Sequence, residues 1–326
     1  MLKLGIISFA HLHAHSYAAC LKSLENVDFI GIADENIRRG TQAAEKFGVK
    51  YFKRFSHLIQ AGVNAVIITS HKQFTLEAAV NGIHVLCEKP IAATIHDALQ
   101  MIQVCREKGV IFQMAFPCRF LTPVRIAKEA VDSGELGKIY AAVGTNRGKN
   151  PGGWFVKKEL SGGGAVLDHT VHLVDLMRWF LGSEIKRCYA RIDSSFGTGD
   201  IDDCGTIILD FENGAFGSID PSWSRPDTFP TWGDLTVELV GENGTLMVDA
   251  FKQTVQVYDD NTKRHVETHW GDNMDFEMIH HFIDCVKNGK QPLTTAVDGL
   301  RALEVALTAY ESARKGKPFD ISRTEI

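Results

Sequence analysis

The chain has 326 residues, a net charge of −5 and 44% hydrophobic residues. This length suggests roughly two domains, and the hydrophobic content favours a packed globular core over a disordered chain. The mildly acidic balance argues against a dedicated nucleic-acid or anionic-membrane binder. No apolar run approaches the ~20 residues needed to span a bilayer. The first residues fit a β-strand better than a signal peptide, so we expect neither a nucleic acid nor a membrane as partner.

The seven cysteines are scattered, odd in number and without a CxxC pair. This spacing does not favour a disulfide framework or a zinc ribbon. Reduced thiols are typical of the cytoplasm, so we expect a cytoplasmic protein.

The first third of the sequence alternates strand and helix patterns. Apolar strand-like runs occur at 4–9, 29–33, 65–70, 84–90 and 110–116. Helical patterns separate them, most clearly at 37–47 and 94–108. Hydrophobic strands without alternation predict a parallel sheet covered on both faces. In such sheets, ligands bind outside the carboxyl ends of the strands.

The pattern changes after about residue 120. Helices are predicted at 123–133, 165–181, 273–287 and 296–315. Strands are predicted at 138–147, 185–195, 204–211, 214–223, 234–241, 244–250 and 253–258. Short turns such as FENGAF and VGENGTL join neighbouring strands, which indicates hairpins and an antiparallel sheet.

The loop after the first strand lacks the expected glycines. A Rossmann fold usually carries GxGxxG there, because glycines permit a tight turn and a close approach to pyrophosphate. Residues 8–13 read SFAHLH instead. Ala10 is small, Ser8 can form a hydrogen bond, and the following helix start offers free N–H groups. Taken alone, this motif would be rejected as a phosphate loop.

Three histidines follow in an HxHxH pattern, at His11, His13 and His15. They suggest either a metal site or an imidazole N–H contact to pyrophosphate. Side chains two residues apart converge only in an extended segment, and no downstream Cys/His cluster completes a ligand set. We therefore expect no metal.

Asp34 ends the second strand, near the ~20-residue offset expected for a carboxylate that binds the adenine ribose. It is also a candidate N-cap for the next helix. A carboxylate there repels a 2′-phosphate and favours NAD over NADP, although Arg38 and Arg39 lie close enough to weaken that preference.

A charged turn, Glu88-Lys89-Pro90, follows a buried strand. This position lies at the ligand edge of a parallel sheet, and the proline restrains the lysine backbone. The simpler alternative is a surface turn with a solvated lysine.

The helix at 165–181 has the sharpest pattern. Asp168, His172, Asp175 and Trp179 share one face of it. A solvent-exposed stripe is the default interpretation. However, this composition is unusual for such a stripe, and the three preceding glycines allow a chain segment or ligand to approach closely. His169 lies about 100° away and is either a core or a pocket residue.

Together these features resemble the Gfo/Idh/MocA family, which includes glucose–fructose oxidoreductase and inositol dehydrogenase. The resemblance runs through HVLCEKPIA, PCRFLTPVRIAKEAVDSGELGKIY, ELSGGGAVLDHTVHLVDLMRWFLG, GENGTLMVD and DGLRALEVALTAYESARKGKP. It implies an α/β protein with an N-terminal Rossmann domain (1–118). It also implies a C-terminal α+β domain (119–326) whose large, open, mostly antiparallel sheet forms a homodimer or homotetramer.

The resemblance further implies an NAD(P)-dependent dehydrogenase that oxidises a secondary hydroxyl of a sugar, sugar derivative or cyclitol. NAD is the expected cofactor and NADP the alternative. The family's catalytic residues fall on Lys89, Asp168 and His172. We expect His172 to take the hydroxyl proton, Lys89 to donate to the hydroxyl oxygen, and Asp168 to position the substrate or share the proton relay.

The expected binding residues form two sets. The cofactor set is Ser8, Phe9, Ala10, His11, Leu12, Asp34, Thr69, Ser70, His71, Glu88, Lys89 and Arg119. The substrate set is Lys89, Arg119, Trp154, Asp168, His169, His172, Trp223 and Trp232. The tryptophans suit stacking on a sugar, and packing of loops or of an oligomer interface is an equal alternative.

Three other functions stay open. An NAD-dependent glycosidase would use transient oxidation at the sugar ring. A catalytically silent sugar- or nucleotide-sensing protein is suggested by the missing glycines. A metal-dependent variant would use Asp168, His169 and His172.

Overall fold

The computed structural model describes residues 1–70, 72–197, 199–269 and 271–326. Its N-terminal part is built on a six-stranded parallel sheet with the order β3-β2-β1-β4-β5-β6. The strands are β1 (Leu2–Ile7), β2 (Val27–Ala33), β3 (Lys50–Phe52), β4 (Ala65–Ile68), β5 (His84–Cys87) and β6 (Phe112–Met114). This strand order is that of the Rossmann fold, so the predicted parallel sheet is confirmed.

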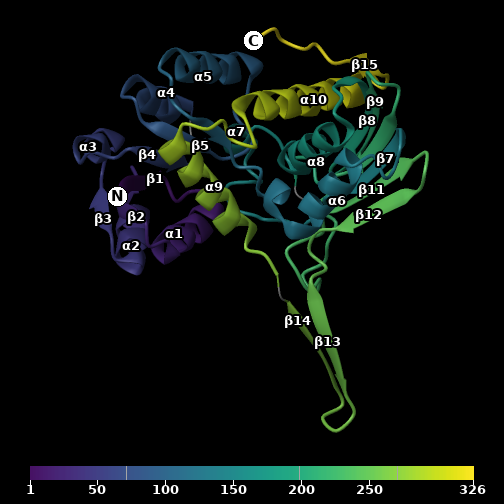
Figure 1. The fold of residues 1–326 in the computed structure, drawn as a ribbon, viewed down its shortest axis with the longest axis horizontal. Helices are drawn as coiled ribbons and strands as arrows, with labels where there is room; N and C mark the ends of the chain where they lie inside the picture. The colour runs from purple at the N-terminus through teal and green to yellow at the C-terminus, as the bar shows by residue number, and fades with distance from the viewer. Residues whose placement is uncertain (71, 198, 270) are drawn as a thin grey trace.

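Helices lie on both faces of this sheet (Figure 1). They are α1 (His13–Ser23), α2 (Ile37–Phe47), α3 (Phe55–Gln60), α4 (Lys72–Val80) and α5 (Ile95–Glu107). The side chain of Asn36 accepts a hydrogen bond from the Arg39 N–H and so caps α2. The suggestion that Asp34 is this N-cap is therefore wrong, because α2 begins two residues later than that suggestion requires.

The C-terminal part is built on a seven-stranded sheet with the order β12-β11-β7-β10-β9-β8-β15. Its strands are β7 (Ile139–Thr145), β8 (Ile185–Asp193), β9 (Cys204–Phe211), β10 (Phe216–Asp220), β11 (Thr236–Gly241), β12 (Thr245–Asp249) and β15 (Phe319–Asp320). Strands β7 and β10 are parallel and the other neighbours antiparallel. The predicted mostly antiparallel sheet is confirmed.

The remaining helices follow β6 in the chain. They are the 3-10 helix η1 (Pro117–Phe120), α6 (Thr122–Asp132), α7 (Lys158–Ser161), α8 (Ala165–Leu181), α9 (Met274–Asn288) and α10 (Ala296–Lys315). Helices α8 and α10 lie on one face of the large sheet (Figure 1). Helix α9 returns to the N-terminal part, where Met278 and Phe282 join the core packed around α1. The boundary between residues 118 and 119 separates the two sheets and stays a prediction for the domains.

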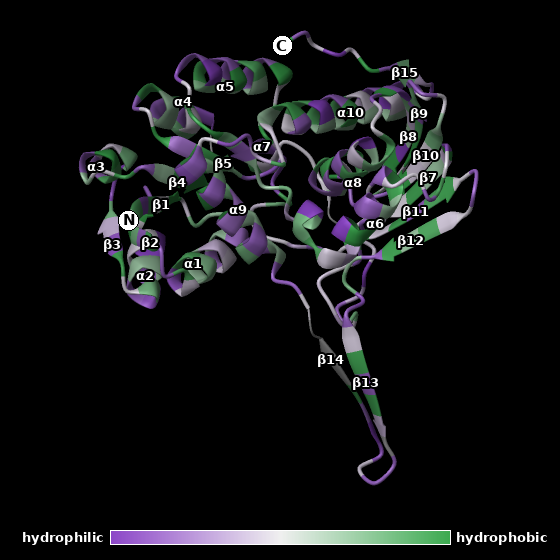
Figure 2. Ribbon diagram, in the orientation of Figure 1, coloured by the Kyte–Doolittle hydropathy of each residue, from purple (hydrophilic) through white to green (hydrophobic). Residues whose placement is uncertain are grey.

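A two-stranded ribbon extends from the large sheet (Figure 1). It consists of β13 (Thr254–Asp259) and β14 (Arg264–His269), which pair only with each other among the described strands. A strand near 253–258 was predicted, but its partner β14 was not. Figure 2 shows the hydrophobic stretch on β13, where Val255 and Val257 are exposed.

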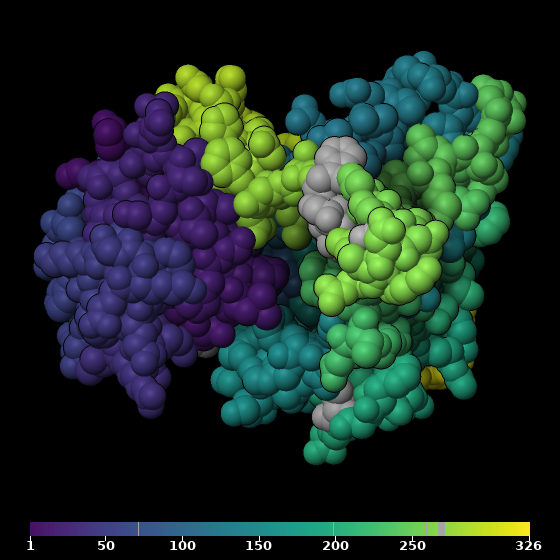
Figure 3. Space-filling view, turned by 90° about the horizontal axis from the view of Figure 1, so that it is seen from below, coloured from purple at the N-terminus to yellow at the C-terminus, as the bar shows by residue number. Residues whose placement is uncertain are grey.

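In the space-filling view of Figure 3, the N-terminal part (purple and blue) lies beside the C-terminal part (teal and green). Among the described residues, no helix has both the length and the apolar character needed to cross a membrane.

Candidate active site

A cleft of about 320 Å³ lies at the carboxyl ends of the parallel strands. This is the edge where open α/β sheets bind ligands. Ser8 follows β1, Asp34 follows β2, Thr69 follows β4, and Glu88 follows β5. Predicted residues that line the cleft are Ser8, Ala10, His11, Asp34, Thr69, Ser70, Glu88, Lys89 and Trp154. His71 lies outside the described residues.

The loop after β1 adopts a tight turn without glycine. Ser8 has a φ of 71°, in the left-handed region that glycine usually occupies. Its N–H donates to the Ala33 carbonyl at 2.8 Å, and the Thr69 hydroxyl donates to its carbonyl at 2.9 Å. The Ser8 hydroxyl accepts the Ala10 N–H at 3.2 Å. These hydrogen bonds hold the serine in a conformation that is costly for a residue with a Cβ atom.

Two predicted cofactor residues turn their side chains away from the cleft. Phe9 is buried in the N-terminal core against Phe47, and Leu12 is 53% exposed. Neither side chain lines the cleft. The Phe9 N–H donates to an Asp34 oxygen at 2.8 Å.

Asp34 is buried at one end of the cleft and paired with Arg39. The Arg39 Nε and Nη2 atoms donate to its two oxygens at 2.8 and 2.7 Å. Gly40 permits this arrangement, because a Cβ atom there would lie 2.8 Å from the Asp34 Cβ and 2.4 Å from the Tyr51 ring. Arg39 also lines the cleft. From the sequence we expected Arg39 only as a nearby positive charge that weakens the preference for NAD. The bidentate pair with Asp34 was not predicted.

The cleft fits a dinucleotide. Ser70 lines it, and its buried hydroxyl has no hydrogen-bond partner among the residues that the structure describes. A buried hydroxyl without a partner is costly, so a polar ligand in the cleft would relieve that cost. Asp34 offers the carboxylate that a ribose requires, once it shares or releases Arg39.

Lys89 joins the two parts of the molecule. It is only 6% exposed, and its Nζ lies 2.5 Å from the Asp168 Oδ1 atom on α8. Burial by itself would raise the pKa of Asp168, but Lys89 and the neighbouring His169 more than offset this and lower it. The alternative of a solvated surface lysine is wrong, because the ammonium is buried in an ion pair.

His172 lies one turn after Asp168 on α8 and is 7% exposed. Its ring contacts Phe116, with centroids 6.0 Å apart, and its buried Nδ1 has no hydrogen-bond partner within the described part of the chain. Burial, followed by the charge of Lys89, moves the pKa of His172 well below its ordinary value. The imidazole is therefore neutral at pH 7 and able to accept a proton.

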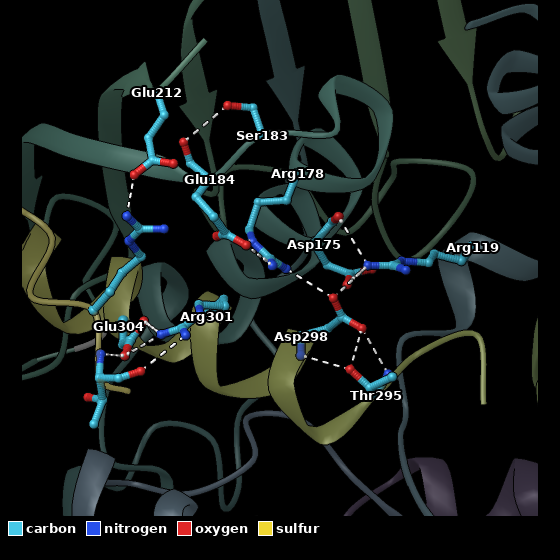
Figure 4. Close-up of polar contacts among 12 residues, drawn as sticks. Arg119, Asp175, Arg178, Ser183, Glu184, Glu212, Thr295, Asp298, Arg301 and Glu304 are labelled. Atoms are coloured by element: carbon cyan, nitrogen blue, oxygen red, sulfur yellow. Dashed lines mark hydrogen bonds and ion pairs between the residues drawn. The ribbon is translucent and has the colours of Figure 1, made fainter. Parts of the chain in front are cut away.

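On the same helix face Asp175 is buried and Trp179 is partly buried, so the interpretation as a solvent-exposed stripe is wrong. Asp175 accepts two hydrogen bonds from Arg119, at 2.8 and 2.6 Å (Figure 4). Arg119 also lies 3.3 Å from Asp298, which in turn pairs with Arg178 at 3.0 Å. The Arg119 guanidinium lies over the Trp179 ring, with its Cζ atom 5.1 Å from the ring centroid.

This network corrects the prediction for Arg119. The residue does not line the cleft, and its guanidinium is engaged with Asp175, Asp298 and the Leu293 carbonyl. A buried charge is stable only when it is paired. Arg119 thus anchors the far end of α8 and is not available to a cofactor or substrate.

The three glycines before α8 make room for another chain segment. A Cβ atom at Gly164 would lie 1.9 Å from the Asp202 carbonyl oxygen. The Asp202 carboxylate accepts the N–H groups of Gly164 and Val166 at 3.0 and 2.8 Å. Asp202 therefore satisfies the free N–H groups at the start of this helix.

Two models of known families match the chain. The model described as an oxidoreductase family with an NAD-binding Rossmann fold matches residues 2–116, and the GFO/IDH/MocA C-terminal domain matches residues 124–247. The chain belongs to the Gfo/Idh/MocA family. It is therefore an oxidoreductase whose N-terminal Rossmann fold binds NAD.

Individual relatives match over almost the whole chain. Scyllo-inositol 2-dehydrogenase (NAD(+)) of Bacillus subtilis is 28% identical, over 98% of this chain and 95% of that protein. Myo-inositol 2-dehydrogenase of Thermotoga maritima is 28% identical, over 95% of this chain and 96% of that protein. The crystal structure of GenD2 from gentamicin A biosynthesis, in complex with NAD, has a TM-score of 0.90 and 24% identity, and the match covers 99% of this chain and 97% of that chain. This likeness demonstrates the shared fold.

The predicted tryptophans of this Gfo/Idh/MocA protein lie in different environments. Trp154 lines the cleft, with its ring 5.8 Å from His11. Trp223 is buried in a small cluster with Phe155, so the packing alternative describes it better. Trp232 is 46% exposed and packs against His169, 5.9 Å away, outside the cleft.

His169 is a buried residue that supports Asp168. Its Nδ1 lies 3.0 Å from the Pro221 carbonyl, and its Nε2 lies 3.3 Å from the Asp168 Oδ2. Burial lowers its pKa. A neutral imidazole donates from only one nitrogen, and the Pro221 carbonyl can only accept, so Nδ1 carries the proton and the ring packs against Asp168 without donating to it.

Two histidines of the HxHxH motif meet Glu88 beside the cleft. The ligating atoms of His11, His13 and Glu88 lie within 4.8 Å of one another. The His13 Nδ1 lies 2.8 Å from a Glu88 oxygen, and the His11 Nδ1 accepts the His13 N–H at 3.2 Å. These hydrogen bonds use the Nδ1 atoms of both histidines. The expectation of no metal stays a prediction. Glu88 comes from 75 residues downstream, so spacing in the sequence could not reveal this cluster.

Proposed function

We propose that this protein oxidises a secondary hydroxyl of a sugar, sugar derivative or cyclitol, with Lys89, Asp168 and His172 as its catalytic residues. The observation that carries the proposal is the 2.5 Å contact between Lys89 and Asp168, with a neutral imidazole one helical turn away. The names of the inositol dehydrogenases among its relatives support this substrate class.

Three residues have separate roles in the removal of the hydroxyl proton. NAD, when bound, accepts a hydride from the carbon that carries the hydroxyl. His172 takes the hydroxyl proton at Nε2, since its Nδ1 is buried. Lys89 donates a hydrogen bond to the hydroxyl oxygen and stabilises the negative charge that develops there. Asp168, supported by His169, holds the lysine in place and positions the substrate.

The cofactor contacts we propose follow the strand ends. Ser8, Ala10, His11, Thr69, Ser70, Glu88 and Lys89 line the cleft, and Phe9 and Leu12 contribute backbone groups only. Burial lowers the pKa of His11 to about 4, so its ring is neutral. Because its Nδ1 accepts the His13 N–H, its Nε2 carries the hydrogen and can donate a hydrogen bond to a diphosphate. Asp34 favours NAD because its charge repels a 2′-phosphate. Arg39 beside it keeps NADP as the alternative.

We also propose a homodimer or homotetramer formed through the outer face of the large sheet. Val143 pairs with Ser218, and Ser218 pairs with Ile208, so their side chains share one face. Phe216 and Met247 are 58% and 70% exposed. Such exposed apolar residues on a sheet face mark an interaction surface. Light scattering after size-exclusion chromatography measures the subunit number, and a monomer would contradict the proposal.

A cytoplasmic location is proposed from the cysteines. All seven are free, and six of them are buried. Reduced thiols of this kind are usual in the cytoplasm and uncommon in secreted proteins. Fractionation of cells that express the protein tests this location.

A dehydrogenase screen tests the main proposal. The purified protein is assayed with NAD and NADP against inositols, aldoses, sugar acids and glycosides, and NADH formation is followed by absorbance. We expect turnover of at least one cyclitol or sugar, with NAD preferred. Aglycone release without net NADH would point to the glycosidase. Calorimetry that detects no binding of NAD or NADP would point to the sensor, and a stoichiometric metal would point to the metal-dependent variant.

A further inference from the structure

The third position of the expected glycine motif is occupied by a histidine that contacts the catalytic turn. His13 is the first residue of α1, and its Nδ1 lies 2.8 Å from the Glu88 Oε1. Tyr17, one turn later on α1, donates to the same oxygen. The other carboxylate oxygen accepts the Lys89 N–H at 2.9 Å. Glu88 therefore connects the first turn of α1 to the backbone of the catalytic lysine.

The Glu88 carboxylate is buried, at 5% exposure, so its charge needs a partner. Burial tends to lower the pKa of His13, but the charge and hydrogen bond of Glu88 more than offset this and raise it. The groups that act on His13 are Glu88 and Lys89 after β5, and Asp275 on α9. Tyr17 contacts its ring from α1, and His11 contacts it from the loop. Glu88 thus favours the protonated, imidazolium form of His13.

We propose that His13 is a positioning residue: through Glu88 it holds the turn that carries Lys89, so that the phosphate-binding loop and the catalytic lysine form one unit. A glycine at this position would let α1 and the sheet pack closely but would offer Glu88 no partner. The kinetic part of this inference rests on the proposed function. The structural part does not.

Two substitutions separate the hydrogen bond from the bulk of the ring. His13→Phe keeps an aromatic ring and removes the donor. His13→Asn places an amide nitrogen near the position of Nδ1 and can restore the hydrogen bond without the charge. Because a hydrogen bond to a charged group is lost, we expect His13→Phe to lower kcat about 10–100-fold. We expect His13→Asn to recover most of this loss, and the dissociation constant of NAD to change less than about threefold in both.

The partner of the pair is tested by a double-mutant cycle. Glu88→Gln removes the charge, and the His13→Phe/Glu88→Gln variant removes both. If the two residues act only through each other, the double variant loses no more activity than the worse single variant. Independent, multiplicative losses would overturn the proposal.

His15→Phe is the matched control. His15 belongs to the same HxHxH motif, but its ring packs against Phe9 and Phe47, away from Glu88. The same substitution there is expected to leave kcat unchanged. An equal loss in His15→Phe would show that any change to this helix start is harmful, which overturns a specific role for His13.

The pH dependence has a defined sign. A raised pKa means that protonated His13 and the ion pair persist to a higher pH than an ordinary imidazolium and are lost as the pH rises through that pKa. The ratio of wild-type kcat to His13→Phe kcat is therefore largest at low pH and falls as the pH rises. A ratio independent of pH would overturn the proposal.

Two measurements do not need turnover and so separate this inference from the proposed function. NMR of histidine-labelled protein should give His13 a pKa above 6.5, which falls in Glu88→Gln. Hydrogen–deuterium exchange at residues 84–92 should be faster in His13→Phe and unchanged in His15→Phe. If both hold in a protein that oxidises no sugar, the proposed function fails and the positioning of the turn stands. Unchanged exchange in His13→Phe, or a stoichiometric metal that this variant loses, would overturn it.

Discussion

The candidate site has an N-terminal wall and a C-terminal wall. The first preserves a backbone conformation, and the second preserves particular side chains. The N-terminal wall, formed by residues 8–13, Asp34 and the 88–90 turn, lacks all three glycines of a phosphate loop, yet Ser8 keeps a φ of 71°. The C-terminal wall is α8, which does not itself line the cleft of 320 Å³ but holds Asp168 and His172 beside the cleft residue Lys89. The first wall shows that side chains can change while the backbone conformation is preserved by hydrogen bonds. The second shows Asp168, a proposed catalytic residue, fixed by its ion pair with Lys89.

The chemistry explains this difference. A diphosphate is bound largely by backbone N–H groups and the start of a helix, so several side chains can surround the same backbone. Proton transfer needs a side chain with a suitable pKa within reach of the substrate hydroxyl. Fewer residue types can therefore replace the catalytic residues than can replace the residues around a diphosphate. Substitutions on the second wall should therefore cost more activity than substitutions on the first.

The largest expected effect is at Lys89, where the two walls meet. Lys89→Met removes the ammonium and leaves Asp168 unpaired, so we expect kcat to fall about 10³–10⁴-fold. Steady-state kinetics with NAD and the best substrate of the screen measures this. Lys108→Met, on the exposed end of α5, is the control and should be neutral. A loss below tenfold would remove Lys89 from the mechanism.

The anchoring of the second wall is tested at Arg119. Arg119→Met leaves Asp175 buried without its partner, which should cost about 3–5 kcal/mol in the free energy of unfolding. The double variant Arg119→Met/Asp175→Leu replaces both charges and should recover most of the loss. Urea denaturation measures both. An Arg119→Met variant as stable as wild type, but with weaker NAD binding, would return Arg119 to the cofactor set.

The base is tested through its pH dependence. His172→Asn should lower kcat about 10²–10³-fold. Burial and Lys89 lower the pKa of His172, so wild-type activity should persist below pH 6.5 and decline only as the pH falls through the lowered pKa. This acid limb should be absent from the variant. Its survival in His172→Asn would assign the base to another group.

A smaller effect is expected on the first wall at Asp34. Asp34→Ser removes the carboxylate that we expect to bind the ribose, so NAD affinity should fall about tenfold to a hundredfold. NADP affinity should rise, because the repulsion is gone and Arg39 loses its partner. Calorimetry with both nucleotides measures the change. Unaltered NAD binding would place the ribose elsewhere.

Much of the fold could be predicted from local patterns. The helix limits 165–181, 37–47 and 296–315 agree with the structure, because apolar spacing and capping signals lie within the segment itself. The turn at Lys89 and the carboxylate of Asp34 were also placed correctly at strand ends. Trp223 and Arg119 were predicted as site residues but lie outside the cleft. The residue type alone does not show whether an aromatic ring or a cation faces a ligand or the core.

The sequence by itself determined the alternation of strands and helices and the Gfo/Idh/MocA resemblance, from which the catalytic residues are proposed. Only the tertiary structure decided which charges meet: Lys89 with Asp168 across 79 positions, His13 with Glu88 across 75, and Arg119 with Asp175 across 56. The reason is physical. Periodicity and capping depend on neighbours in the chain, whereas the partner of a buried charge depends on how distant elements pack.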